Sequence, residues 1–80
     1  QIMGSIRFYT TSGCHLCDEA WQRLEPVAKR RGLTVECVEI MDDTDAEAAY
    51  AEFIPVIECP QRARPLHWPF DLADLYRYLP

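Results

Sequence analysis

The stretch Phe8-Tyr9-Thr10-Thr11-Ser12-Gly13-Cys14-His15-Leu16-Cys17 places two cysteines, three positions apart, between a strand-like segment and a helix-like one. Residues 6–10 are β-branched or aromatic except for Arg7, which favours a strand, and the residues that follow favour a loop. At the first turn of a helix, unpaired backbone N–H groups and the positive end of the helix dipole stabilise an anion. We therefore expect Cys14 to lie where a thiolate, the form that attacks disulfides, is stabilised.

Composition and charge argue against several classes of protein. The chain has 80 residues, 49% of them hydrophobic, which suits one domain with one modest core. Its formal net charge is -5, which leaves no continuous basic surface for nucleic acid or anionic lipid. No apolar run approaches the roughly 20 residues that span a bilayer, and no signal peptide is recognisable. We expect a cytoplasmic monomer that binds neither nucleic acid nor membrane.

Hydrophobic periodicity predicts the next elements. Apolar residues at three- and four-residue steps predict an amphipathic helix over residues 14–31, with Gly32 as its C-cap and a kink at Pro26. Residues 33–40 form a second strand whose apolar phase slips, which indicates a bulge or burial on both faces. Glu36 and Glu39 mark exposed positions of this strand.

A short helix, a hairpin and a closing helix complete the predicted fold. Thr44 and Glu47 fit a capping box before a helix that ends near residue 52. Residues 53–59 and 65–68 read as strands joined by a turn. Pro69 suits the start of the last helix, whose positive end lies near Asp71 and Asp74. The order β-α-β-α-β-β-α over residues 1–80 predicts a single α/β domain with a mixed four-stranded sheet flanked by helices.

These residues resemble the thioredoxin fold in its glutaredoxin-like form. The resemblance rests on residues 8–17, followed far downstream by Ile54-Pro55-Val56, and it covers nearly the whole chain. The motif Cys-His-Leu-Cys-Asp-Glu-Ala, here residues 14–20, is similar to that of a group of small bacterial glutaredoxin-like proteins. The resemblance implies that the bond before Pro55 is cis and that this proline packs beside the active-site sulfurs.

The cysteine pair has the spacing that thiol–disulfide exchange requires. Cys14, at the helix cap and open to solvent, is the predicted nucleophile, and Cys17, on the apolar stripe of the helix, is the predicted resolving thiol. His15 would lower the pKa of Cys14, whereas Asp18 and Glu19 would raise it. The hypothesis is an enzyme, a glutaredoxin-like thiol–disulfide oxidoreductase without a bound cofactor.

The expected substrate is a disulfide in a protein or in a small thiol, bound by His15, Ile54 and Pro55. Ordinary glutaredoxins hold glutathione with a basic residue before the first cysteine and a Gly-Gly pair before the last helix. The corresponding segments here are 11–13 and 68–71, and the carboxylate of Asp71 at the helix start would repel that of glutathione. These departures put glutathione in doubt as the dedicated partner.

Two other functions stay open. The two thiols could carry zinc or an iron–sulfur cluster, with a second ligand pair taken from Cys37, Cys59, His15 or His67. Against this, Cys37 and Cys59 stand singly within strands and are more simply explained as small buried hydrophobic residues, so no metal is expected. The remaining alternative is a thioredoxin-fold binding module in which the disulfide is structural.

Overall fold

The sheet is built around strand β1, Gly4–Thr10, in the computed structural model, which describes residues 4–80. Strand β2 (Leu33–Glu39) pairs with β1 in parallel, and strand β3 (Val56–Glu58) pairs with its other edge in antiparallel fashion. Strand β4 (Leu66–His67) pairs antiparallel with β3, so the order is β2-β1-β3-β4. The predicted mixed four-stranded sheet is confirmed.

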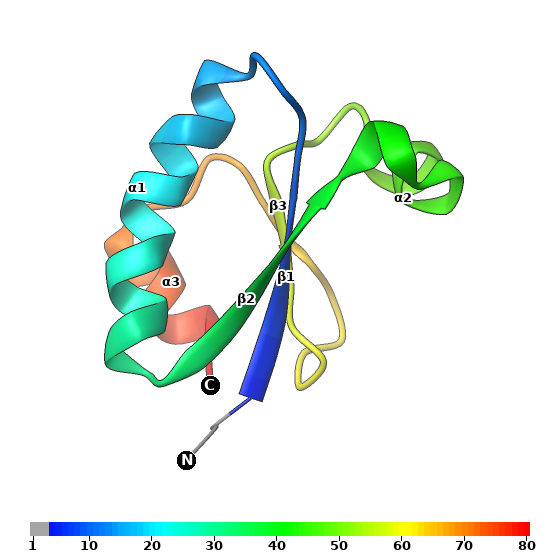
Figure 1. Cartoon of the computed structure of the whole chain (residues 1–80). Coiled ribbons are helices and arrows are strands. Elements are labelled where there is room, and N and C mark those ends of the chain that lie inside the picture. The colour runs from blue at the N-terminus through cyan, green and yellow to red at the C-terminus, as the bar shows by residue number, and fades with distance from the viewer. Residues whose placement is uncertain (1–3) are drawn as a thin grey trace.

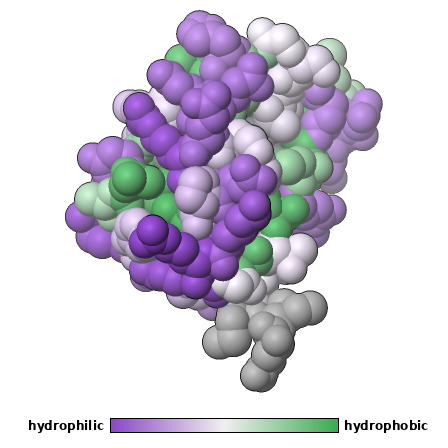
Figure 2. All heavy atoms as spheres, turned by 60° about the vertical axis from the view of Figure 1, so that its left-hand side comes forward, coloured by the Kyte–Doolittle hydropathy of each residue, from purple (hydrophilic) through white to green (hydrophobic). Residues whose placement is uncertain are grey.

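Helices lie on both sides of this sheet. Helix α1 (His15–Arg30) and helix α3 (Leu72–Tyr78) share one side, while α2 (Thr44–Tyr50) lies on the other (Figure 1). A 3-10 turn, η1 (Ile40–Asp42), joins β2 to α2. The face that α1 and α3 present outward is largely hydrophilic, with hydrophobic residues in small patches (Figure 2). Among residues 4–80, no helix has the length and apolarity to cross a membrane.

Helix α1 follows the predicted periodicity. Its buried residues recur along one side and pack against the sheet. The helix ends at Arg30, and its C-cap is Arg31 and not the predicted Gly32. Gly32 follows at φ 66°, a conformation that glycine adopts without a steric penalty. Pro26 lies inside α1, which continues to Arg30, and the kink expected there stays a prediction.

Strand β2 packs against apolar side chains on both faces and has no bulge. Its register with β1 is continuous from Gly4 opposite Leu33 to Thr10 opposite Glu39. Leu33 and Val35 pack towards α1 and α3, whereas Val38 packs in the cluster on the α2 side. Two expectations for this strand were wrong, because Cys37 is exposed and Glu39 is half-buried.

Helix α2 begins with a different cap from the predicted one. The Asp43 side chain accepts a hydrogen bond from the Ala46 backbone N–H at 3.0 Å, so Asp43, and not Thr44, is the N-cap. Either residue type can cap a helix, and here Asp43 has the extended backbone that the cap requires, with φ -139°. The helix also ends at Tyr50, earlier than predicted.

The segment between α2 and β3 is a turn and not a strand. The backbone N–H groups of Phe53 and Ile54 both donate to the Tyr50 carbonyl, at 2.8 and 3.1 Å. Strand β3 therefore starts at Val56, three residues later than the predicted strand.

Helix α3 begins with a reciprocal cap. The Asp71 side chain accepts from the Asp74 backbone N–H at 2.9 Å, and the Asp74 side chain accepts from the Asp71 N–H at 3.0 Å. This capping box explains why the helix begins at Leu72 rather than at Pro69.

Candidate active site

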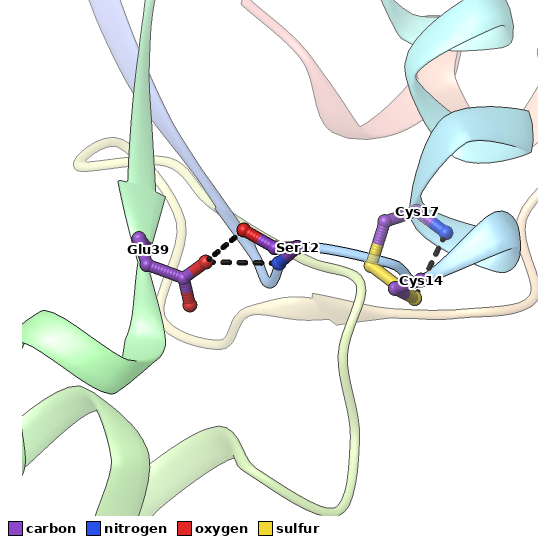
Figure 3. The surroundings of a disulfide bond; sticks show 4 residues. All are labelled: Ser12, Cys14, Cys17 and Glu39. Atoms are coloured by element: carbon purple, nitrogen blue, oxygen red, sulfur yellow. Dashed lines mark hydrogen bonds between the residues drawn. A yellow bond between two sulfur atoms is a disulfide. The ribbon is translucent and has the colours of Figure 1, made fainter.

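The candidate site is the disulfide between Cys14 and Cys17 at the start of α1 (Figure 3). Cys14 is the N-cap residue, and its sulfur accepts a hydrogen bond from the Cys17 backbone N–H at 3.2 Å. Cys14 is half-buried, whereas Cys17 is only 2% exposed because it faces the core from the first turn of the helix. The two sulfurs therefore differ in access to solvent, and the more accessible one has the free amides of the helix start beside it.

Glu39 holds the loop that leads to Cys14. One of its carboxylate oxygens accepts from the Ser12 backbone N–H at 2.9 Å and from the Ser12 hydroxyl at 3.2 Å, as Figure 3 shows. The other accepts from the Met41 backbone N–H at 3.0 Å. The Met41 N–H, followed by the Thr11 side chain and then Ser12, lowers the pKa of Glu39 below its ordinary value.

The parallel pairing of β1 and β2 brings Glu39 to this loop. Thr10 lies opposite Glu39, so the carboxyl end of β2 stands beside the segment that leaves β1 for α1. Nothing in the local pattern around Glu39 indicates this contact, because its partner is 27 positions away in the sequence.

The predicted substrate-binding residues lie at the same end of the sheet. Tyr9 pairs with Val56, so Pro55 stands next to the carboxyl end of β1, from which the 11–14 loop leaves. Pro55 is buried, Ile54 is half-buried, and the peptide bond between them is cis. His15, the first residue of α1, is exposed.

The residues on either side of Pro55 contact β4 and the segment after it. The Pro55 carbonyl accepts from the Trp68 backbone N–H at 3.1 Å. Phe53 stacks on His67 with ring centroids 4.8 Å apart and an interplanar angle of 11°. His67 is thus placed near the Pro55 segment by an aromatic contact, and the sequence had given it no role beyond a possible metal ligand.

The other two cysteines are separate from the pair and from each other. Cys59 is buried and its thiol donates to the side-chain oxygen of Gln61 at 3.0 Å. Cys37 is exposed on β2, although partial burial of its thiol raises its pKa. Within residues 4–80, no group of three or more His, Cys, Asp or Glu side chains is close enough together to hold a metal ion.

A carboxylate on the α2 side of the sheet connects three elements. Glu58 of β3 accepts from the Tyr9 hydroxyl at 3.0 Å and from the Tyr50 hydroxyl at 2.8 Å. Burial, followed by the hydrogen bond to Glu58, raises the pKa of Tyr50 to about 12, so its hydroxyl stays protonated at neutral pH. Sequence reasoning missed this cluster, which joins β1, α2 and β3.

Two comparisons relate this chain to known proteins. The model of the Glutaredoxin-like domain (DUF836) matches residues 5–80. The X-ray structure of the structural-genomics target protein XcR50 from X. campestris is 37% identical, with a TM-score of 0.74 over 91% of this chain and 92% of that one. No curated protein matches the sequence. Because the family model covers nearly the entire sequence and the structural neighbour shares its thioredoxin-like fold, the chain belongs to the glutaredoxin-like domain family (DUF836).

Proposed function

We propose that this protein is a thiol–disulfide oxidoreductase in which Cys14 is the nucleophile and Cys17 the resolving thiol. One observation carries the proposal: the Cys17 N–H points at the Cys14 sulfur, 3.2 Å away, while Cys17 itself is 2% exposed. In the reduced protein the same amide would donate a hydrogen bond to the Cys14 thiolate and stabilise it. Membership of a glutaredoxin-like family supports the same chemistry.

The reaction proceeds in two exchanges. The Cys14 thiolate attacks one sulfur of a substrate disulfide, the substrate S–S bond breaks, and the departing thiolate takes a proton from solvent. Cys17 then loses its proton to solvent and its thiolate attacks the Cys14 sulfur. The mixed disulfide breaks, the intramolecular disulfide forms, and the second substrate thiolate leaves and takes up a proton. The substrate gains two electrons and the protein loses two, and a dithiol reductant returns the pair to its starting state.

The substrate would dock beside Pro55. Support comes from the position of this residue at the sheet end from which the 11–14 loop leaves, and from Ile54, which is half-buried in the cluster that contains Tyr9 and Val56. His15 adjoins the nucleophile and is exposed, so its imidazole would contact a substrate bound at Cys14.

Single-turnover trapping tests the roles of the two thiols. Reduced Cys17→Ser, mixed with bis(2-hydroxyethyl) disulfide and no other thiol, is expected to accumulate a mixed disulfide on Cys14, because nothing resolves it. Intact-protein mass spectrometry before and after Cys14 alkylation measures the adduct. Cys37→Ser is the matched control and should behave as the parent. If Cys17→Ser releases both product thiols as fast as the parent, Cys17 is not the resolving thiol.

A further inference from the structure

Charge is distributed unevenly around the disulfide. The end of the molecule that carries it, which we call the disulfide end, comprises segments 11–20, 39–46 and 51–55, which lie together in the upper part of Figure 1. These segments contain no Lys or Arg. They do contain carboxylates on both sides of the disulfide, namely Asp18, Glu19, Glu39, Asp42, Asp43, Asp45 and Glu52.

Most of the basic residues lie away from this end. Lys29, Arg30 and Arg31 are at the far end of α1, and Arg62 and Arg64 are in the loop between β3 and β4. Arg7 lies within β1 and pairs with Glu36 at 3.3 Å. Arg23, the first cation along α1, is about 12 Å along the axis from His15, at about 1.5 Å per residue. Its guanidinium donates to the Phe70 carbonyl at 3.0 Å and lies over the Trp68 ring.

The disulfide end also exposes large apolar side chains. Leu16, between the two cysteines, is 38% exposed, Met41 is 66% exposed and Phe53 is 46% exposed. The Glu39 carboxylate connects Met41 to the loop before Cys14, and Phe53 lies two residues before Pro55. Apolar side chains around a reactive sulfur, within a rim of carboxylates, are suited to a polypeptide partner that brings both apolar contact and positive charge.

We propose that the substrate of this site is a polypeptide disulfide flanked by Lys or Arg side chains. This inference rests on the proposed function, because it names the substrate of the same two cysteines. The excess of carboxylates over cations at this end attracts a cationic segment and raises its association rate, and it repels an anionic one. Oxidised glutathione has more carboxylates than amines and is therefore a net anion, so the carboxylates at this end repel it.

A charge series of peptides tests the proposal. The probes are three short peptides, each closed by one internal disulfide and otherwise matched, with Lys, Gln or Glu beside both cysteines. Protein reduced with dithiothreitol and freed of it reacts with each peptide in a single turnover, followed by the change in tryptophan fluorescence and by mass spectrometry. Each rate constant is divided by the rate constant for reduction of the same peptide by dithiothreitol. This normalisation corrects for differences in intrinsic reactivity among the three peptide disulfides.

At roughly 0.01 M salt we expect the Lys peptide to react about tenfold faster than the Glu peptide. A tenfold ratio is at the low end of the rate enhancements that electrostatic steering produces. At about 1 M salt the ratio should approach unity, because the screening length shrinks to about 3 Å. Equal normalised rates at low salt, or oxidised glutathione reacting faster than the Lys peptide, would overturn the proposal. Failure of all three peptides to react, the neutral one included, would instead overturn the proposed function.

A pair of charge reversals locates the effect. Asp42→Lys changes an exposed carboxylate of η1 at the disulfide end and should lower the Lys-to-Glu rate ratio several-fold. Glu25→Lys makes the same change of charge farther from the disulfide, about 15 Å along α1 from His15 at about 1.5 Å per residue. Its Lys-to-Glu rate ratio should stay within about twofold of the parent's ratio. If both variants lower the ratio equally, net charge governs the rate and the disulfide end has no specific role.

Discussion

At the scale of single residues, Glu39 connects the loop before Cys14 to η1. Its carboxylate accepts three hydrogen bonds, two from Ser12 and one from Met41. Ser12 belongs to the loop that leads to Cys14 and Met41 belongs to η1, so this one side chain fixes the relative position of the two segments. A carboxylate suits the place because it offers two oxygens and needs no donor of its own.

Glu39→Gln should loosen this loop. The glutamine amide supplies a single oxygen. Its NH2 group is a donor and would face the N–H donor of either Ser12 or Met41, so one of these hydrogen bonds is lost. We expect faster hydrogen exchange at the Ser12 and Met41 amides, and a changed alkylation rate at reduced Cys14, measured by NMR and by iodoacetamide labelling. Glu36→Gln, three positions earlier on β2, is the control and should leave both readouts unchanged. Unaltered exchange at Ser12 in Glu39→Gln would contradict the role assigned here.

The same contact sets a pH dependence in the parent protein. Because the pKa of Glu39 is lowered by folding, its stabilisation is present above its ordinary value of 4.5 and is lost as the pH falls through the lower folded value. Protection of the Ser12 amide should therefore decline in that acidic range.

At the scale of secondary structure, the end of α3 depends on two arginines from elsewhere in the chain. The helix spans only Leu72–Tyr78, and its last carbonyls have no partners within it. Arg31 donates to the carbonyls of Tyr76, Leu79 and Pro80 at 2.9–3.0 Å. Arg62 donates to those of Arg77 and Tyr78, at 2.6 and 2.8 Å. These bonds join α3 to the end of α1 and to the β3–β4 loop.

Arg31→Met should destabilise the fold by about 1–3 kcal/mol, since it removes charged donors from several carbonyls while keeping an apolar stem against Tyr76. Arg30→Met, the adjacent and exposed position, makes the same change of charge and should cost no more than about 0.5 kcal/mol. Urea unfolding followed by far-UV circular dichroism measures both. Equal losses in the two variants would show that charge at the end of α1, and not the contact with α3, accounts for the effect.

At the scale of the whole molecule, the sheet separates two hydrophobic clusters of unequal size. The larger one lies between the sheet and the layer of α1 and α3, and includes Phe8, Leu24 and Phe70. On the α2 side, the buried members are Tyr9, Ile40, Ala46 and Val56. Strand β1 supplies both clusters because successive side chains of a strand point to opposite faces. Helix α2 therefore has much less buried apolar surface to hold it than α1 has.

This asymmetry predicts different local stabilities. Amides of α2 should exchange through openings of lower free energy than amides in the middle of α1, which should exchange only on global unfolding. Native-state hydrogen exchange at increasing sub-denaturing urea separates the two, because local openings depend weakly on urea. Amides of α2 that are protected to the global limit would show that the Tyr9–Tyr50–Glu58 contacts hold this helix as firmly as the larger cluster holds α1.

The features that follow from the sequence are those encoded over a few neighbouring residues. Spacing places Cys14 and Cys17 at a strand-to-helix junction, and periodicity predicts α1 and its buried face. The order of elements was correct because strands and helices of this length leave separable apolar patterns. Asp43 and Thr44 are adjacent candidates for the N-cap of α2, and the local sequence pattern does not decide between them. The backbone conformation of the folded chain decides for Asp43.

The features that only the tertiary structure decided depend on contacts between distant segments. Glu39 reaches Ser12 because two parallel strands pair in one particular register, and a shift of one residue would turn that side chain to the other face. Plain alternation along β2 places Val35 and Val38 on opposite faces of the sheet, and only the packing of the whole chain shows that both faces are covered. The sequence by itself determined where the two sulfurs of the disulfide lie along the chain. Folding decided which charges and apolar side chains surround them, because those neighbours come together only when the sheet forms.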